Sequence, residues 1–201
     1  GHGLGVAPKF IVIKSRSGIT NWIVGHDSAG WSSAFEGLNT TDAFRAADAK
    51  YWNSTAPTST VVTFGNEGNL NGNGSTFVAY CFAPVSGYSS FGSYTGNNSA
   101  DGPFCFTGFR PRWLLIKSAG YAADWIIVDS ARETYNVMSK ALFPNRAYYE
   151  AQASTALRVD FLSNGFKIRS TDGSAEGWNY PSNSHVWAAF AENPFSIARA
   201  K

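Results

Sequence analysis

The sequence has few of the residues from which metal centres, disulfide frameworks and nucleic-acid interfaces are built. Its 201 residues include 2 cysteines and 3 histidines, and only 15% of them are charged. The net charge is +2, and the lysines and arginines are scattered without a basic run, so we expect no nucleic-acid partner. No apolar stretch approaches the roughly 18–20 residues of a membrane-spanning helix, so we expect no membrane insertion.

The two cysteines do not make a disulfide framework. Cys81 lies in an apolar, strand-like run and Cys105 lies in the segment PFCFT, so we expect both to be small buried apolar side chains. A bond between them stays open at this point. Two cysteines without neighbouring histidines fit no structural zinc site. We expect no cofactor, although a calcium ion held by loop oxygens would leave no motif in the sequence.

Aromatic residues and glycine are what the chain has in quantity. Aromatics make up 15% of the residues, and there are 20 glycines, a composition typical of extracellular and viral all-β proteins. Runs of β-branched and aromatic residues, bounded by Gly, Asn, Ser or Pro, predict strands. These runs lie at 10–14, 22–26, 59–64, 76–83, 88–94, 113–117, 125–129, 157–162, 166–169 and 185–191.

Two short segments have a helical pattern instead. Residues 41–51 begin with good helix-capping residues and place Phe44, Ala47 and Tyr51 along one stripe. Residues 145–151 hold a comparable place later in the chain. We therefore predict an all-β fold, an antiparallel β-sandwich of jelly-roll or concanavalin-like type with one or two short surface helices.

The sequence contains the same pattern twice. Residues 8–15 (PKFIVIKS) return as 111–118 (PRWLLIKS), and residues 21–24 (NWIV) return as 124–127 (DWII), 103 positions later in each case. The ends also agree, with FVAYCFAP in the first copy and VWAAFAENP in the second.

A repeat of about a hundred residues is too long for a solenoid unit. We therefore predict a single β-sandwich module over residues 1–201, built from two sequence-related halves at about 5–87 and about 104–195. An active site that depends on one unique corner fits such a duplication poorly.

Motifs for phosphate binding and nucleophilic catalysis are weak. The glycines of residues 1–5 and 65–74 lack the Lys-Ser/Thr pair and the following helix that a phosphate loop needs. No G-x-S-x-G elbow is present. His26 corresponds to Asp129 of the second copy, which favours a strand end over a catalytic base, and His185 is expected at the exposed start of a strand.

A glycosidase would need two facing carboxylates, one of them with a raised pKa. Asp124 and Asp129 lie five positions apart on one predicted strand, so their side chains point to opposite faces. The other candidates have no visible partner and are Glu133, Asp160, Glu176 and Glu192. We expect a protein that is not an enzyme, with a glycan hydrolase as the remaining enzymatic alternative.

Aromatic residues in predicted loops give the one positive functional signal. Tryptophan and tyrosine beside Ser, Asn and Gly suit stacking on sugar faces or on a protein partner. These loop aromatics are Trp31, Trp52, Tyr148, Tyr149, Trp178 and Tyr180. The segment EGWNY is the most ligand-like, and the predicted ligand-binding residues are Trp178, Tyr180, Glu176, Trp31 and Trp52. The alternative is that these rings fold back and cap the sandwich.

Several segments together resemble a domain of bacteriophage tail-fibre and other virion structural proteins. They are GLGVAPKFIVIK from residue 3, AYCFAPVSGY from 79, FGSYTGN from 91, DGPF from 101, TGFRP from 107, DFLSNGFK from 160 and AFAENPF from 189. The resemblance spans nearly the whole chain and brings no catalytic or ligand motif with it. By fold-level analogy, such domains look like concanavalin or laminin-G sandwiches that decorate fibres or bind host glycans.

The resemblance implies a non-catalytic module on the virion that recognises a host-surface glycan or protein receptor. It also implies contacts with other virion or tail proteins and a homo-oligomer, a trimer, of the full-length protein, in which weak sugar contacts gain avidity. A purely structural module for decoration or assembly is the first alternative, and a polysaccharide-degrading enzyme is the second. The sequence begins with Gly and shows no signal peptide, which fits a fragment of a longer chain.

Overall fold

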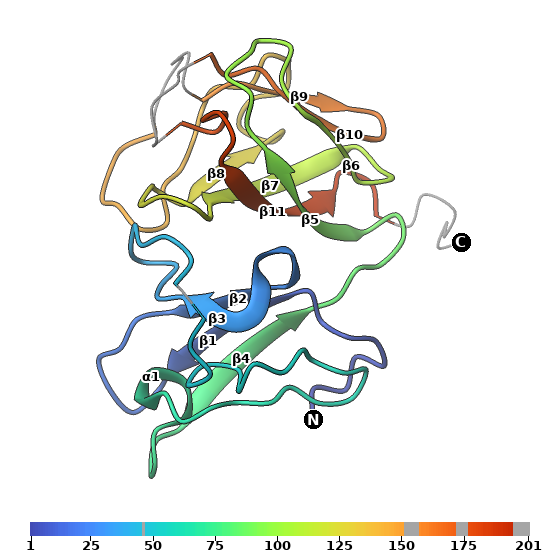
Figure 1. Cartoon of the computed structure of the whole chain (residues 1–201). Coiled ribbons are helices and arrows are strands. Elements are labelled where there is room, and N and C mark those ends of the chain that lie inside the picture. Colours follow the sequence, from blue (N-terminus) through green and yellow to red (C-terminus); the bar gives the residue numbers. More distant parts are fainter. Residues whose placement is uncertain (46, 151–156, 172–176, 195–201) are drawn as a thin grey trace. The chain divides into compact units, whose positions relative to one another are not determined.

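The computed structural model describes residues 1–45, 47–150, 157–171 and 177–194. The fold is nearly all β, with three antiparallel sheets, and the predicted all-β antiparallel class is confirmed. The described helices are one turn of α-helix, α1 (Gly68–Asn71), and a 3₁₀ turn, η1 (Asp27–Ala29). Neither is long and apolar enough to cross a bilayer. The chain divides into two compact units, unit 1 at Gly1–Ala83 and unit 2 at Pro84–Lys201 (Figure 1).

Unit 1 is one four-stranded sheet with a covered face. Its strands run in the order β3 (Gly30–Phe35), β2 (Ile23–His26), β1 (Phe10–Ser15) and β4 (Phe77–Phe82). The connection between β3 and β4 packs on one face of this sheet, because its apolar side chains join the core of the strands. The buried core cluster consists of Ile11, Ile13, Ile23, Trp31, Ala34, Tyr51, Trp52 and Leu70.

Unit 2 is a sandwich of two sheets. One sheet has the order β5 (Ser89–Thr95), β11 (Ser184–Ala191), β7 (Pro111–Ser118) and β8 (Ile126–Asp129), and the other β6 (Phe104–Phe106), β10 (Gly165–Ile168) and β9 (Val159–Leu162). The ring of Phe166 on β10 meets Trp187 on β11 edge to face, with 5.3 Å between centroids. One buried apolar cluster therefore joins the two sheets.

The central hairpins of the two units have the same pairing register. Phe10 pairs with His26 in unit 1, and Trp113 pairs with Asp129 in unit 2, each 103 positions later. β1 has β2 on one side and β4 on the other, and β7 has β8 and β11 in the same places. The repeated words of the sequence thus occupy equivalent places in two sheets. Descent of the two units from one duplicated ancestor stays a prediction.

Two local predictions were wrong. Residues 41–45 and 47–51 form no helix, because the N–H groups of Arg45 and Asp48 donate to the carbonyls of Ala34 and Ser32 on β3, at 3.2 and 2.7 Å. The segment therefore runs beside a strand instead of making helical bonds to itself. Residues 59–64 form no strand, because the Thr58 hydroxyl accepts the N–H groups of Thr60 and Val61 in a local turn.

The other differences are smaller. Residues 145–150 form no helix, and residue 151 lies outside the described part of the chain. The strands β3 and β6 were not predicted, since GWSSAF and FCF are too polar or too short to stand out. The remaining predicted strands are present, with ends that shift by one or two residues.

Candidate functional site

Two of the predicted ligand-binding tryptophans belong to the interior of unit 1. Trp31 and Trp52 are buried and meet edge to face, with 5.3 Å between ring centroids. Gly25 on β2 lies beneath both rings, and a Cβ atom there would come within 2.6 Å of each. Buried rings with no free face cannot stack on a sugar, so their role is to fill the core. Trp31 was read as a loop residue because β3 was not recognised.

The remaining predicted residues lie in unit 2. Trp178 is buried in the sandwich core, and its carbonyl accepts a hydrogen bond of 2.7 Å from the Tyr94 hydroxyl. Tyr180 is half-buried and meets the exposed Tyr121 edge to face at 4.9 Å. Glu176 lies outside the described residues. The five predicted residues are thus divided between two units, and the three tryptophans among them are buried.

His185 is buried, so its predicted place at an exposed strand end was wrong. Its ring stacks on Tyr94 at 4.9 Å with an interplanar angle of 6°. Burial, helped by the positive charge of Lys117, lowers the pKa of His185 to about 4. A neutral, enclosed imidazole of this kind supports the packing of unit 2 and is not placed to meet a substrate.

Every candidate glycosidase carboxylate in the described part of the chain already has an arginine or backbone N–H partner. Four of them form ion pairs with arginine at 2.6–2.8 Å: Asp124 with Arg146, Asp129 with Arg132, Asp160 with Arg169, and Glu192 with Arg110. Glu133 instead accepts the N–H groups of Ser139 and Lys140, at 2.6 and 2.8 Å. Hydrogen bonds from Arg132 lower the pKa of Asp129, although burial opposes them. A general acid needs the opposite shift.

Metal ligands and reactive thiols are also poorly placed. Within the described residues, no three or more His, Cys, Asp or Glu side chains gather where they would hold a metal ion. Both cysteines are free, which settles the question left open above. Burial raises the pKa of Cys105 to about 12 and also raises that of Cys81, so both stay as thiols near neutral pH.

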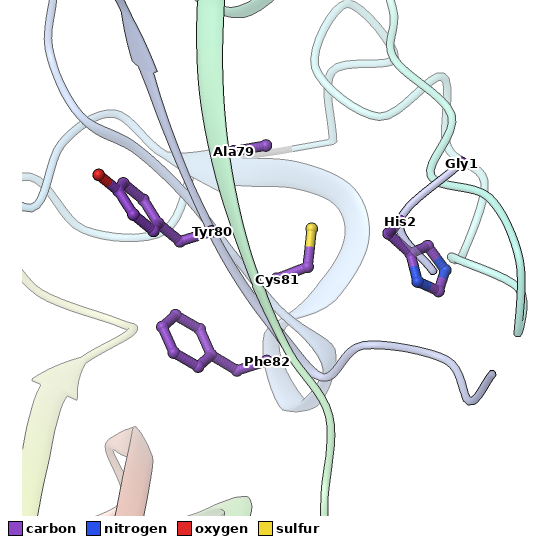
Figure 2. A pocket seen from close by; sticks show the side chains of 6 residues that line it. All are labelled: Gly1, His2, Ala79, Tyr80, Cys81 and Phe82. Carbon is purple, nitrogen blue, oxygen red and sulfur yellow. The ribbon is translucent and has the colours of Figure 1, made fainter. Parts of the chain in front are cut away.

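A hollow of about 460 Å³ lies beside β4 and is lined by His2 and Cys81, among others. Figure 2 shows Ala79 and Cys81 on the side of β4 toward His2, and Tyr80 and Phe82 on the opposite side. His2 is not a base for Cys81, because its Nδ1 accepts the Leu4 N–H and its Nε2 faces the Thr58 carbonyl at 3.1 Å. A cysteine–histidine pair is therefore not formed here.

The connection between β8 and β9, residues 130–158, carries three exposed tyrosines. Tyr135 is 84% exposed, Tyr148 59% and Tyr149 89%. The apolar side chains of Val137 and Leu142 are exposed in the same segment. Its described residues, 130–150 and 157–158, contain no helix or strand. Long connections of this kind frequently bind ligands.

Residues 136–142 of this connection are tied to the sandwich. The Asn136 side chain acts like a neighbouring strand, because it donates to the Phe161 carbonyl and accepts the Phe161 N–H, both at 2.9 Å. Isolated bridges join Met138 to Val159 and Leu142 to Ile127. The backbone is therefore held while the tyrosines stay exposed, which lowers the entropy lost when a ligand binds.

Tyr148 and Tyr149 lie six and seven residues beyond Leu142, the last residue of these bridges. The ring of Tyr148 meets Phe143 edge to face at 5.9 Å, and the Arg146 guanidinium lies 5.5 Å from its centroid. Tyr149 makes no hydrogen bond or ring contact with the described residues and presents its ring to solvent. Contacts on Tyr148 fix one ring, and the other is left open.

Polar groups lie next to these rings. Asp124 Oδ1 accepts hydrogen bonds from Asn145 Nδ2 at 2.6 Å and from Arg146 Nε at 2.7 Å. Asn145 Oδ1 in turn accepts the Trp125 N–H at 3.0 Å, which ties the group to the start of β8. We call Asp124, Asn145, Arg146, Tyr148 and Tyr149 the tyrosine platform. Sequence reasoning placed both tyrosines among the loop aromatics but did not select them, since burial could not be ranked from composition.

Comparison with known proteins gives a family and no individual relative. No curated protein and no solved structure matches the chain. One family model covers residues 1–194 and is described as Domain of unknown function (DUF7483). The match spans almost the whole chain, both units included, and the chain therefore belongs to the DUF7483 domain family.

Proposed function

We propose that the chain is a non-catalytic module of a phage tail fibre or related virion protein, which recognises a host-surface glycan or receptor through the tyrosine platform. The observation that carries the proposal is the exposure of Tyr148 and Tyr149 on a connection that is anchored to the sandwich at Met138 and Leu142. The resemblance of the sequence to phage virion domains supplies the biological setting, the virion.

The platform has the two kinds of groups that sugar binding needs. An exposed tyrosine ring stacks on the apolar C–H face of a sugar ring. Planar polar side chains, here Asp124, Asn145 and Arg146, bind hydroxyl groups in fixed directions. A flat site of this size binds one sugar weakly. Several copies on one particle would raise the overall avidity.

A structural role in particle assembly is the second candidate. The short edge strand β6 exposes Phe104 and Phe106 on both sides of the buried Cys105. Exposed apolar rings on an edge strand suit a protein contact better than a sugar. A hydrolase receives less support, because the described carboxylates of the earlier glycosidase scheme are held by cations or backbone N–H groups.

The proposal is tested by binding of the purified chain to a glycan array and to cells of candidate hosts. The double variant Tyr148→Ala/Tyr149→Ala should lose binding while it keeps the wild-type circular dichroism. Tyr135→Ala is the matched control, because this tyrosine lies in the same connection and is about as exposed as Tyr149, but lies outside the platform. Binding that survives the double variant, or a folded wild type that binds neither glycan nor cell, contradicts the proposal.

A further inference from the structure

The strand β4 is an open edge of the unit 1 sheet. It is the last strand in the order β3-β2-β1-β4. The Arg16 N–H donates to the Thr76 carbonyl, and the Lys9 N–H donates to the Phe82 carbonyl, both at 2.8 Å. Backbone groups alternate in direction along an antiparallel strand. The N–H and C=O groups of Phe77, Ala79 and Cys81 therefore face away from β1 and bond to no other described segment.

The opposite edge of the same sheet is treated differently. The carbonyls of Ser32 and Ala34 on β3 accept hydrogen bonds from Asp48 and Arg45, so the connection after β3 covers that edge. Beside β4 there is instead a hollow of about 460 Å³, lined by β4 residues and by Gly1 and His2 (Figure 2). The sheet thus has one satisfied edge and one edge with room beside it.

The β4 edge also lacks the features that keep strands from pairing between molecules. Soluble proteins protect such edges with charged side chains, proline, bulges or a covering segment. Residues 74–84 contain no charged residue, and the first proline, Pro84, follows the strand. The register of β4 against β1 is regular from Phe77 to Phe82, without a bulge.

In unit 2, the edge that corresponds to the open edge of β4 is paired with another strand. Its strand β11 pairs with β7 as β4 pairs with β1, and the other side of β11 is filled by β5. This β5–β11 pairing is antiparallel and runs from Ser89↔Phe190 to Thr95↔Ser184. An antiparallel strand therefore completes the sheet of unit 2 at the place that stays open in unit 1.

We propose that two copies of this chain pair through their β4 strands, antiparallel and across a two-fold axis. The outward backbone groups of Phe77, Ala79 and Cys81 recur at every second residue, so two identical strands present matching donors and acceptors. Neither strand carries a charge, so no like charges face each other. The two sheets of unit 1 then join into one continuous sheet, independently of any glycan bound by unit 2.

The test is the molar mass of the purified chain, measured by sedimentation velocity over a wide range of concentrations. The wild type should form dimers. Ala79→Pro removes the outward N–H of an exposed edge residue and leaves the β1 ladder intact, so it should weaken dimerisation by about tenfold or more. Ala79→Ser keeps the N–H and is the matched control, expected to dimerise like the wild type.

Each other outcome has a definite meaning. A wild type that stays monomeric at every concentration overturns the proposal, and so does a wild-type trimer. A folded Ala79→Pro variant that still dimerises like the wild type places the interface elsewhere and also overturns it. Where the proline variant does not fold, Ala79→Lys decides, because a charge at this exposed position should give a folded monomer.

Discussion

The two hairpins begin with the same polar clamp. In unit 1 the Asn39 side chain accepts the Trp22 N–H at 2.9 Å and donates to Asn21 at 2.9 Å. In unit 2 Asn145 does the same with Trp125 and Asp124, at 3.0 and 2.6 Å. The clamp is followed by Thr40 in unit 1 and by Arg146 in unit 2, where the guanidinium reaches Tyr148. The shared clamp fixes the strand, and in unit 2 the residue after it adds a contact to the tyrosine platform.

At the other end of each hairpin, a side chain accepts a backbone N–H two residues later, but the type of side chain differs. His26 Nδ1 accepts the N–H of Ser28, and Asp129 Oδ1 accepts the N–H of Ala131, in each case two residues later. Next to these, the N–H of Asp27 donates to the Lys9 carbonyl, and the N–H of Ser130 donates to the Arg112 carbonyl. An imidazole and a carboxylate both act here as the acceptor of a nearby backbone N–H, and the carboxylate of Asp129 also pairs with Arg132.

The surroundings of equivalent residues differ most. Lys14 is half-buried and donates to the Thr20 carbonyl at 2.8 Å, whereas Lys117 is fully buried above the ring of Trp125. Unit 1 covers its sheet with a long connection, and unit 2 covers its own with a second sheet. Local polar contacts thus follow the repeat, while burial depends on what packs against each sheet.

The largest effect is expected from the tryptophans that fill the two cores. Trp52→Ala in unit 1 and Trp178→Ala in unit 2 should each lower the free energy of unfolding by about 3–5 kcal/mol, because each leaves a large cavity. Urea unfolding followed by circular dichroism measures the loss. A Trp178→Ala variant that keeps its stability but binds ligand differently would contradict the packing role and indicate that Trp178 contacts the ligand.

The second effect distinguishes the units by pH. His185 has a folded pKa of about 4, below its ordinary value of 6.5, because it is buried near Lys117. Its contribution is therefore complete above pH 6.5 and is lost as the pH falls toward 4, by about 3 kcal/mol in total. His185→Phe installs the residue that unit 1 has at the equivalent position, Phe77. The variant should lose less stability than the wild type between pH 6.5 and 4, and identical pH profiles would contradict this account.

The third effect compares the two clamps. Asn145→Ala should cost about 1–2 kcal/mol, because it leaves the N–H of the buried Trp125 without its partner. Asn39→Ala should cost about 0.5–1 kcal/mol, since Trp22 is only half-buried and water can replace the amide. Thermal and urea unfolding measure both. A larger loss for Asn39→Ala would mean that the clamps are not equivalent.

The smallest effect on stability is expected at the exposed ring of the platform. Tyr149→Ala should change the free energy of unfolding by less than about 0.5 kcal/mol, because the side chain makes no contact with the described residues that would be lost. The melting temperature should match that of the wild type. A marked loss of stability would show that Tyr149 is a packing residue and not a contact for ligand.

The strands of the repeated hairpin were predictable because their signal is local. The runs FIVI and WLLI are apolar and β-branched, and the words repeat at a fixed spacing. The prediction of a helix at 41–51 was wrong because it used only helix propensity and the spacing of apolar residues. In the structure, the N–H groups of Arg45 and Asp48 donate to carbonyls of β3 instead of forming helical bonds. Strand β3 was missed because its sequence, GWSSAF, contains two serines and no β-branched residue, so only its pairing with β2 shows that it is a strand.

The candidate site was harder to predict than the fold. Composition identified the aromatic residues in loops but not which of them turn inward. Trp31 and Trp52 turn inward because Gly25 leaves space for both rings, a fact that only the packing of β2 and β3 reveals. Tyr148 and Tyr149 turn outward on a connection held by Asn136, whose partner Phe161 is distant in sequence. No local pattern carries that information.

The central claim is that recognition belongs to the platform of unit 2 and not to the clamp that both units share. The most direct measurement is the affinity of the wild type, Asn145→Ala and Asn39→Ala for the glycan or host cell that the array screen selects. Asn145→Ala should bind about tenfold more weakly or worse, because it removes one of the two hydrogen bonds that hold Asp124, the partner of Arg146. Asn39→Ala should bind like the wild type. Equal affinities for all three proteins, or a weaker Asn39→Ala alone, would contradict the account.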